Sequence, residues 1–195
     1  MPETKSVVTR ERFATGLTYQ EFIGQITENK DRFEEFYKNC SISAADKDFF
    51  TKAAKAPGGA ARVMVIGEPW CPDVMRGMPT AARVAEAAEM EMRAFPRDKN
   101  LDIQNEFLKE GKYQSIPVVV FYTQDLQELC RWIERPALAD AERAKIEAEV
   151  RKEKPGAADR EIHQETGNRT RERQAAWQQE SIREWRSLLA KKLGM

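Results

Sequence analysis

The chain has 195 residues and no net charge, because Lys and Arg together number 32 and Asp and Glu also number 32. This balance excludes a global positive field of the kind that attracts nucleic acid or an acidic membrane, so we expect neither as a partner. Three cysteines are too few, and odd in number, for the disulfide framework of a small secreted protein.

The beginning of the chain indicates a cytoplasmic protein. Residues 1–6 lack the apolar segment of a signal peptide. No run of about 18 apolar residues is present that could span a bilayer. The length fits one domain with a core large enough to fold without disulfides.

Residues 1–59 are predicted to form an N-terminal helical layer. Thr18 is a suitable N-cap for a helix whose apolar residues recur every three or four positions, namely Tyr19, Phe22, Ile23, Ile26, Phe33, Phe36 and Tyr37. Gly24 and the polar residues 27–30 predict a kink or a break in that helix. Ser43, with Asp46 three positions later, predicts the start of a second helix, which ends at Pro57-Gly58-Gly59.

Residues 60–136 are predicted to form an α/β core. The continuous apolar run 62–67 indicates a strand covered on both faces. Further elements are expected in this order: a helix over 72–90, a strand near a sheet edge over 91–97, a short helix over 101–109, and a hairpin of 117–122 and 128–133. This order predicts an α/β sandwich with a mixed sheet.

Residues 137–195 are predicted to form a C-terminal helical extension, and all three regions are expected to make one compact unit. A helix over 137–154 ends at Pro155-Gly156, and a second helical stretch follows, with an interruption at Gly167-Asn168. Its last part places a group of large apolar residues on one face: Trp177, Ile182, Trp185, Leu188 and Leu189. We expect this face to pack on the N-terminal layer or on a second copy of the chain, as in a homodimer.

Two short motifs carry a resemblance to a known family. The sequence Trp70-Cys71-Pro72-Asp73-Val74 follows the first predicted strand, and Ile116-Pro117 precedes a later one. Together they resemble the thioredoxin superfamily, in which Trp-Cys-x-x-Cys opens a helix and a cis Ile-Pro faces the first cysteine. The chain is most similar to bacterial thioredoxin-like proteins with a Trp-Cys-x-Asp-Cys motif and a later Arg-Trp-x-x-Arg-Pro, here Arg131 to Pro136.

The resemblance implies a thioredoxin-like three-layer sandwich with a mixed four-stranded sheet and added N- and C-terminal helices. It also implies that Pro117 is cis, with its ring near the sulfur of Cys71. A cysteine at a helix N-terminus is expected to have a lowered pKa, because backbone N–H groups and the helix dipole stabilise the thiolate. Pro72 suits the first helical position, and the carboxylate of Asp73 is expected to offset part of that lowering.

Val74 stands where the second cysteine of the motif would be. The site therefore cannot form an intramolecular disulfide by itself. Cys71 could still form a mixed disulfide that an external thiol resolves, or a sulfenic acid after oxidation. Nothing in the sequence places Cys40 or Cys130 near it, and small buried hydrophobic residues are the simpler interpretation of both.

We therefore consider a single-cysteine thiol protein, used for thiol–disulfide exchange or oxidant sensing, in cell redox homeostasis. Cys71 would be its catalytic residue, and the residues around it would bind substrate: Trp70, Pro72, Asp73, Val74, Ile116 and Pro117. The expected partner is a protein or small molecule with a thiol or disulfide, and no cofactor or metal is expected. The alternative is a non-catalytic thioredoxin-fold binding or assembly module. A third hypothesis, Asp73 as a general base, depends on a single carboxylate and specifies little.

Overall fold

The computed structural model describes residues 6–195, so the first five residues of the predicted N-terminal layer lie outside it. A four-stranded mixed sheet forms the centre, in the order β2-β1-β3-β4. Its strands are β1 (Arg62–Gly67), β2 (Glu91–Pro96), β3 (Val118–Tyr122) and β4 (Glu128–Ile133). β1 runs parallel to β2 and antiparallel to β3, and β4 runs antiparallel to β3. The predicted mixed sheet, the edge position of β2 and the β3–β4 hairpin are confirmed.

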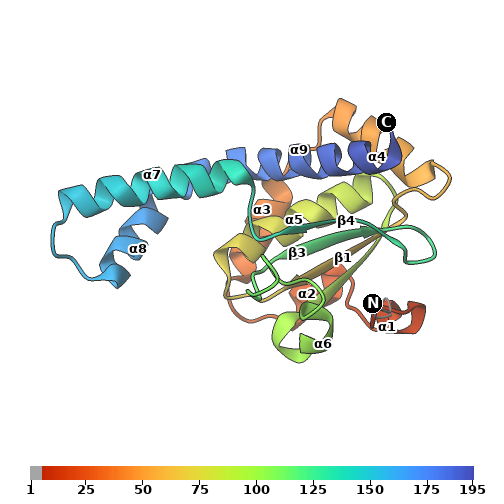
Figure 1. Cartoon of the computed structure of the whole chain (residues 1–195), viewed down its shortest axis with the longest axis horizontal. Helices are drawn as coiled ribbons and strands as arrows, with labels where there is room; N and C mark the ends of the chain where they lie inside the picture. The colour runs from red at the N-terminus through yellow and green to blue at the C-terminus, as the bar shows by residue number, and fades with distance from the viewer. Residues whose placement is uncertain (1–5) are drawn as a thin grey trace.

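Helices cover both faces of the sheet, so the strands sit in a three-layer sandwich (Figure 1). Alternate residues of β1 face opposite cores: Val63 and Val65 join the larger cluster, whereas Met64 and Ile66 join the smaller one. This two-residue period is the geometry of a strand. It explains why the run is continuously apolar, since each face of the strand is covered by a different helical layer.

Residues 6–59 form α1 (Arg10–Ala14), α2 (Tyr19–Gln25), α3 (Lys30–Asn39) and α4 (Ala44–Lys55). The apolar residues of α2, α3 and α4 join the larger cluster, whereas α1 lies on the other face of the sheet. Thr18 caps α2 in a reciprocal capping box with Glu21, as the sequence predicts for this N-terminus. The expected break follows α2, where Asn29 adopts a left-handed conformation before α3. The short helix α1 was not predicted from the sequence, although Thr9 caps it and Phe13 anchors it in the smaller core.

Two predicted elements differ from the structure. α6 covers only Leu101–Gln104 instead of 101–109, because the chain then folds back into a turn that brings Lys109 against Tyr113. The predicted interruption at Gly167-Asn168 is also wrong. α8 (Asp159–Arg169) runs through both residues, and the break comes at the 3₁₀ turn η2 (Arg171–Arg173).

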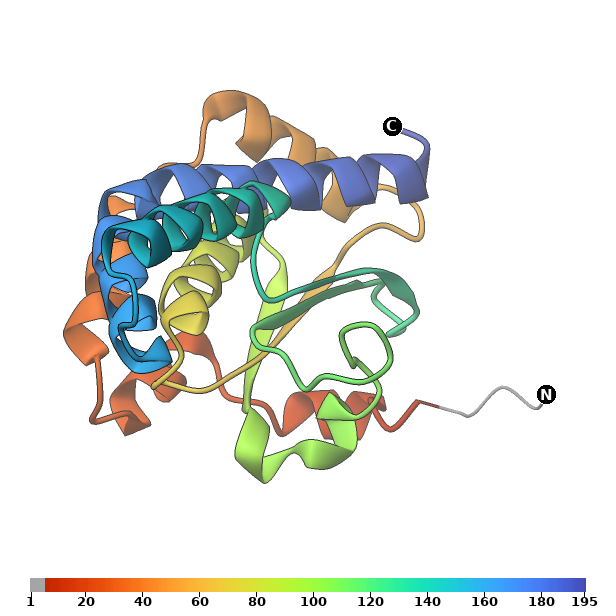
Figure 2. The ribbon, with the colours of Figure 1, turned by 60° about the vertical axis from the view of Figure 1, so that its left-hand side comes forward.

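The helix α5 (Pro72–Ala87) begins after the turn that follows β1, and it packs on the sheet. The helix α7 (Ala137–Glu153) begins shortly after β4 ends. The last helix, α9 (Gln174–Leu193), lies against α4, α5 and β4 (Figure 2). Packing on the N-terminal layer was predicted from its apolar face, and α4 provides it. Contact with the edge strand β4 was not predicted.

Within residues 6–195, no helix is long and apolar enough to cross a membrane.

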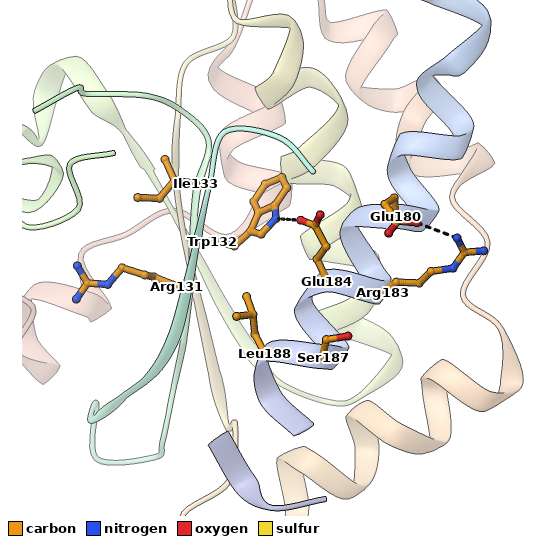
Figure 3. Close-up of a pocket in the computed structure, with 8 residues that line it drawn as sticks. All are labelled: Arg131, Trp132, Ile133, Glu180, Arg183, Glu184, Ser187 and Leu188. Atoms are coloured by element: carbon orange, nitrogen blue, oxygen red, sulfur yellow. Dashed lines mark hydrogen bonds and ion pairs between the residues drawn. The ribbon is translucent and has the colours of Figure 1, made fainter. Parts of the chain in front are cut away.

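A hydrogen bond and an aromatic contact join α9 to β4 (Figure 3). The indole Nε1 of Trp132 donates a hydrogen bond of 2.6 Å to Glu184, whose other carboxylate oxygen accepts one from the backbone of Ala137. The ring of Trp132 also meets that of Trp185 edge to face, with centroids 5.4 Å apart. Beside this contact lies a hollow of about 460 Å³ lined by Arg131, Ile133, Ser187 and Leu188 among others.

Candidate thiol site

Cys71 lies at the junction between β1 and α5. The chain leaves β1 at Gly67 and turns through residues 68–70, with the backbone N–H of Cys71 donating to the carbonyl of Glu68 at 3.2 Å. Cys71 is the N-cap of α5, and Pro72 follows at the first helical position, where a missing N–H costs nothing. Asn29, at the start of α3, stabilises this turn, because its side-chain amide donates a hydrogen bond to the carbonyl of Pro69.

Ile116 and Pro117 form the opposite side of the site. Their peptide bond is cis, and the sulfur of Cys71 lies 3.7 Å from the carbonyl oxygen of Ile116. Gly77 on α5 makes this approach possible, because a Cβ atom there would lie 2.8 Å from Cγ of Pro117. Two segments 45 residues apart therefore meet at one point. Sequence reasoning missed Gly77, whose only signal was a glycine inside a predicted helix.

The electrostatics of Cys71 differ from the expectation. Burial raises the pKa of its thiol above the ordinary value, and the nearby Asp73 carboxylate adds to this rise. The backbone N–H groups of Val74 and Asp73, and the charge of Arg135, oppose it. The predicted lowering of the pKa is therefore wrong: only 9% of Cys71 is exposed, and desolvation outweighs the donors at the helix N-terminus.

Asp73 is held by two arginines that the sequence analysis did not connect with it. One carboxylate oxygen is 2.7 Å from Nη2 of Arg76, and the other is 2.9 Å from Nη2 of Arg135. The residue is also buried. A carboxylate with both oxygens engaged by cations is poorly suited to remove a proton from a substrate. The arrangement therefore gives no support to Asp73 as a general base.

The remaining predicted site residues divide into exposed and buried ones. Trp70 is 49% exposed, and the guanidinium of Arg97 lies over its ring at 5.1 Å. Pro72 is exposed as well, whereas the side chains of Ile116 and Pro117 are buried. Val74 was predicted to contact substrate, but its side chain is fully buried and faces Gly67, because the third position of α5 points into the sheet.

The other two cysteines lie far from the site, and all three are free. Cys40 lies beside Thr80, which is nine residues along α5 from Cys71 and therefore about 13 Å away. Cys130 pairs with Phe121 on β3, five residues beyond Ile116, which corresponds to about 16 Å. Burial raises the pKa of Cys40 to about 11 and that of Cys130 to about 12. Neither thiol is placed to resolve a disulfide at Cys71.

A hollow of about 410 Å³ lies on the Trp70 side of the site. Apolar residues form part of its lining, namely Leu17, Phe22 and Ile26, and the acidic residues Glu28, Glu68 and Asp98 lie around them. The hollow is therefore next to the motif, with Trp70 and Pro69 in its lining. Within residues 6–195, no group of three or more His, Cys, Asp or Glu side chains is arranged to hold a metal ion.

With this geometry established, the family can be assigned. A family model described as Thioredoxin matches residues 16–147, more than half of the chain. The chain belongs to this thioredoxin family. The match includes the Cys71 motif, the Pro117 segment and most of α7, and it ends before α8 and α9.

Solved structures agree on the fold of almost the whole chain. A protein of unknown function from Pseudomonas aeruginosa is similar with a TM-score of 0.63 and 13% identity, covering 94% of this chain and 98% of the other. An HIV epitope-scaffold is similar with a TM-score of 0.64 and 15% identity, covering 96% and 99%. No curated protein matches the chain. These likenesses concern architecture, including the added helices.

Proposed function

We propose that this thioredoxin-family protein carries out thiol–disulfide exchange through the single cysteine Cys71. One observation carries the proposal: the Cys71 sulfur lies at the N-terminus of α5, 3.7 Å from the carbonyl that precedes cis-Pro117. The backbone N–H groups of Val74 and Asp73 act to lower the pKa of this thiol, against the effect of burial. These donors stabilise the thiolate, which is the form that attacks a disulfide.

The reaction would proceed in two exchanges. The Cys71 thiolate attacks one sulfur of a partner disulfide, forms a mixed disulfide, and releases the other partner sulfur as a thiolate. An external thiol, deprotonated, then attacks the mixed disulfide, which returns Cys71 as a thiolate and leaves the partner joined to that thiol. Exposed Trp70 and the hollow beside it would hold the partner, a protein or small molecule that carries a disulfide.

A second function, a non-catalytic binding module, is favoured by a different observation. The Cys71 thiol is largely buried and its pKa is raised, so only a small fraction is thiolate at neutral pH. In this alternative the exposed Trp70 surface binds partners without covalent chemistry. The two functions make opposite predictions for the chemical reactivity of Cys71.

The deciding experiment is alkylation of Cys71 as a function of pH, with Cys40→Ser and Cys130→Ser removing the other thiols. Thiol exchange predicts complete modification by a small alkylating reagent in the folded protein. Because the pKa is raised, the rate should continue to rise above pH 9, the ordinary value for this thiol. A Cys71 that reacts only after denaturation would favour the binding module.

Val74→Cys tests whether the missing second cysteine is the reason that exchange needs an external thiol. Position 74 is one turn after Cys71, so a thiol there comes within bridging distance after a small adjustment. We expect the natural protein to reduce insulin poorly and Val74→Cys to gain measurable turnover. Val74→Ala is the matched control, since it also removes bulk but adds no thiol. Efficient reduction by the natural protein would contradict a site that works with Cys71 alone.

A further inference from the structure

Arg76 is a buried cation on α5, five residues after Cys71. Only 1% of the residue is exposed. Its Nη2 atom donates to Asp73 at 2.7 Å, and its Nη1 atom donates at 2.7 Å to the side-chain carbonyl of Gln174, the first residue of α9. The guanidinium also lies over the ring of Trp177 at 5.3 Å. Residues about 100 positions later in the chain therefore fix the orientation of this side chain.

The burial of the Arg76 guanidinium is not explained by apolar packing. Taking a guanidinium out of water is costly unless its donors are satisfied, and here Nε has no hydrogen-bond partner among the described residues. Burial lowers the pKa of Arg76 and the Asp73 carboxylate opposes that change, yet an arginine remains charged in proteins. A positive charge is thus maintained next to the carboxylate that lies closest to Cys71 along α5.

The charged groups around Cys71 and the ion pairs of Asp73 come from four segments. α5 contributes Asp73 and Arg76, and the chain after β4 contributes Arg135, which contacts Asp73, Glu134 and Asp140. Lys109 pairs with Glu134 at 2.7 Å. Glu68, the first residue of the turn after β1, is buried and accepts a hydrogen bond from the backbone of Asp98. Asp73 is the anion beside the thiol, and Arg76 and Arg135 are the cations that balance it.

We propose, as an extension of the thiol function proposed above, that Arg76 is a positioning residue for Cys71 and that Gln174 and Trp177 hold it in place. Arg76 fixes the Asp73 carboxylate and balances its charge. Without Arg76, the Asp73 carboxylate is paired with Arg135 alone. Its negative charge is then less well balanced, so it destabilises the Cys71 thiolate more strongly. The C-terminal helix thereby influences the reactivity of Cys71 through Arg76 and Asp73.

The test measures the alkylation rate of Cys71 against pH in the full chain with Cys40→Ser and Cys130→Ser. Arg76→Met should raise the midpoint and slow the reaction at pH 7 about threefold, equivalent to about half a pKa unit. Arg76→Lys should restore part of the rate because it keeps the charge. Asp73→Asn should shift the midpoint in the opposite direction, and the double variant Asp73→Asn with Arg76→Met should lie between the two.

Gln174→Ala tests how far α9 holds Arg76 in place, and it does so without removing a charged group. It should slow the reaction in the same direction as Arg76→Met, but by less. Gln179→Ala is the matched control, because Gln179 bonds α9 to another segment, the connection between α3 and α4, through the carbonyl of Ser41, and has no bond to Arg76. Its profile should equal that of the unsubstituted chain.

The outcomes separate the two proposals. If Cys71 never reacts in the folded chain, the thiol function itself is wrong. If it reacts, but Arg76→Met and Gln174→Ala both leave the midpoint of the rate–pH curve unchanged, the function stands and the positioning role of Arg76 is wrong, whatever the effect of Asp73→Asn. Should Arg76→Met fail to fold, Gln174→Ala still decides between these results.

Discussion

The two parts of the C-terminal extension are both rich in charge, yet they relate to the core in opposite ways. α9 buries a row of large side chains against the sheet and its helices, namely Trp177, Ile182, Trp185 and Leu189. The α7–α8 hairpin extends away from the sheet (Figure 1) and contacts mainly itself and the start of α9. Its buried apolar residues are fewer and smaller: Ala139, Val150 and Ile162.

The difference shows that charged composition does not tell where a helix packs. The hairpin is joined by exposed ion pairs, such as Arg169 with Glu153 and Arg151 with Asp159. Each such pair contributes little, because water screens it and ordering two long side chains costs entropy. Burial of two indole rings in α9 contributes far more. We therefore expect α9 to be part of the cooperative unit and the hairpin to unfold locally.

The largest effect is expected from deleting residues 175–195. The buried face of α9 contributes on the order of 10 kcal/mol of gross apolar burial, which is comparable to the whole stability of a typical domain. The truncated chain should lose its cooperative unfolding transition, as measured by circular dichroism during heating. A truncated chain with the full melting temperature would show that α9 is as dispensable as the hairpin.

Trp185→Ala should produce the next largest effect. The ring is fully buried between Phe121 and Trp132, and such a truncation in a core costs about 3–5 kcal/mol. Urea unfolding followed by circular dichroism measures the loss. Trp185→Phe, which keeps an aromatic ring, serves as the control and should lose less. Equal stability of Trp185→Ala and the natural chain would contradict the assignment of α9 to the core.

Glu184→Gln should cost about 1–2 kcal/mol in the same measurement. One carboxylate oxygen accepts from Trp132 and the other from Ala137, and in Gln one of these two oxygens is replaced by an NH2 group, which donates. Glu180→Gln on the same helix is the control, since Glu180 pairs with the exposed Arg183 and the change should stay near zero. If both substitutions cost the same, the attachment of α9 to β4 would not depend on this contact.

Ile162→Ala should have the smallest effect on global unfolding, at most about 0.5 kcal/mol. Ile162 is buried in α8, so its loss should open the hairpin without unfolding the core. Hydrogen exchange should become faster in α7 and α8 and remain unchanged in α9. A large drop in the midpoint of global unfolding would mean that the hairpin and the core unfold together.

The sequence by itself determined the fold and the place of the thiol site. The apolar runs of β1 and β3, the caps at Thr18 and Ser43, and the two motifs are local signals, and local signals set strands, helix starts and turns. The apolar face of α9 also predicted packing either on the N-terminal layer or on a second copy of the chain, and α9 lies against α4 of that layer. The boundaries of α6 and α8 were less accessible, because glycines at 111 and 167 do not reveal where a helix ends.

Only the tertiary structure decided the electrostatics of the site. The contact of Arg76 with Gln174, the approach of Gly77 to Pro117, and the ion pair of Asp73 with Arg135 join residues whose relation no spacing reveals. Burial of Cys71 raises the pKa that its motif predicted to be low. A thiol pKa depends on desolvation and on every nearby charge at once, and those are properties of the packed chain.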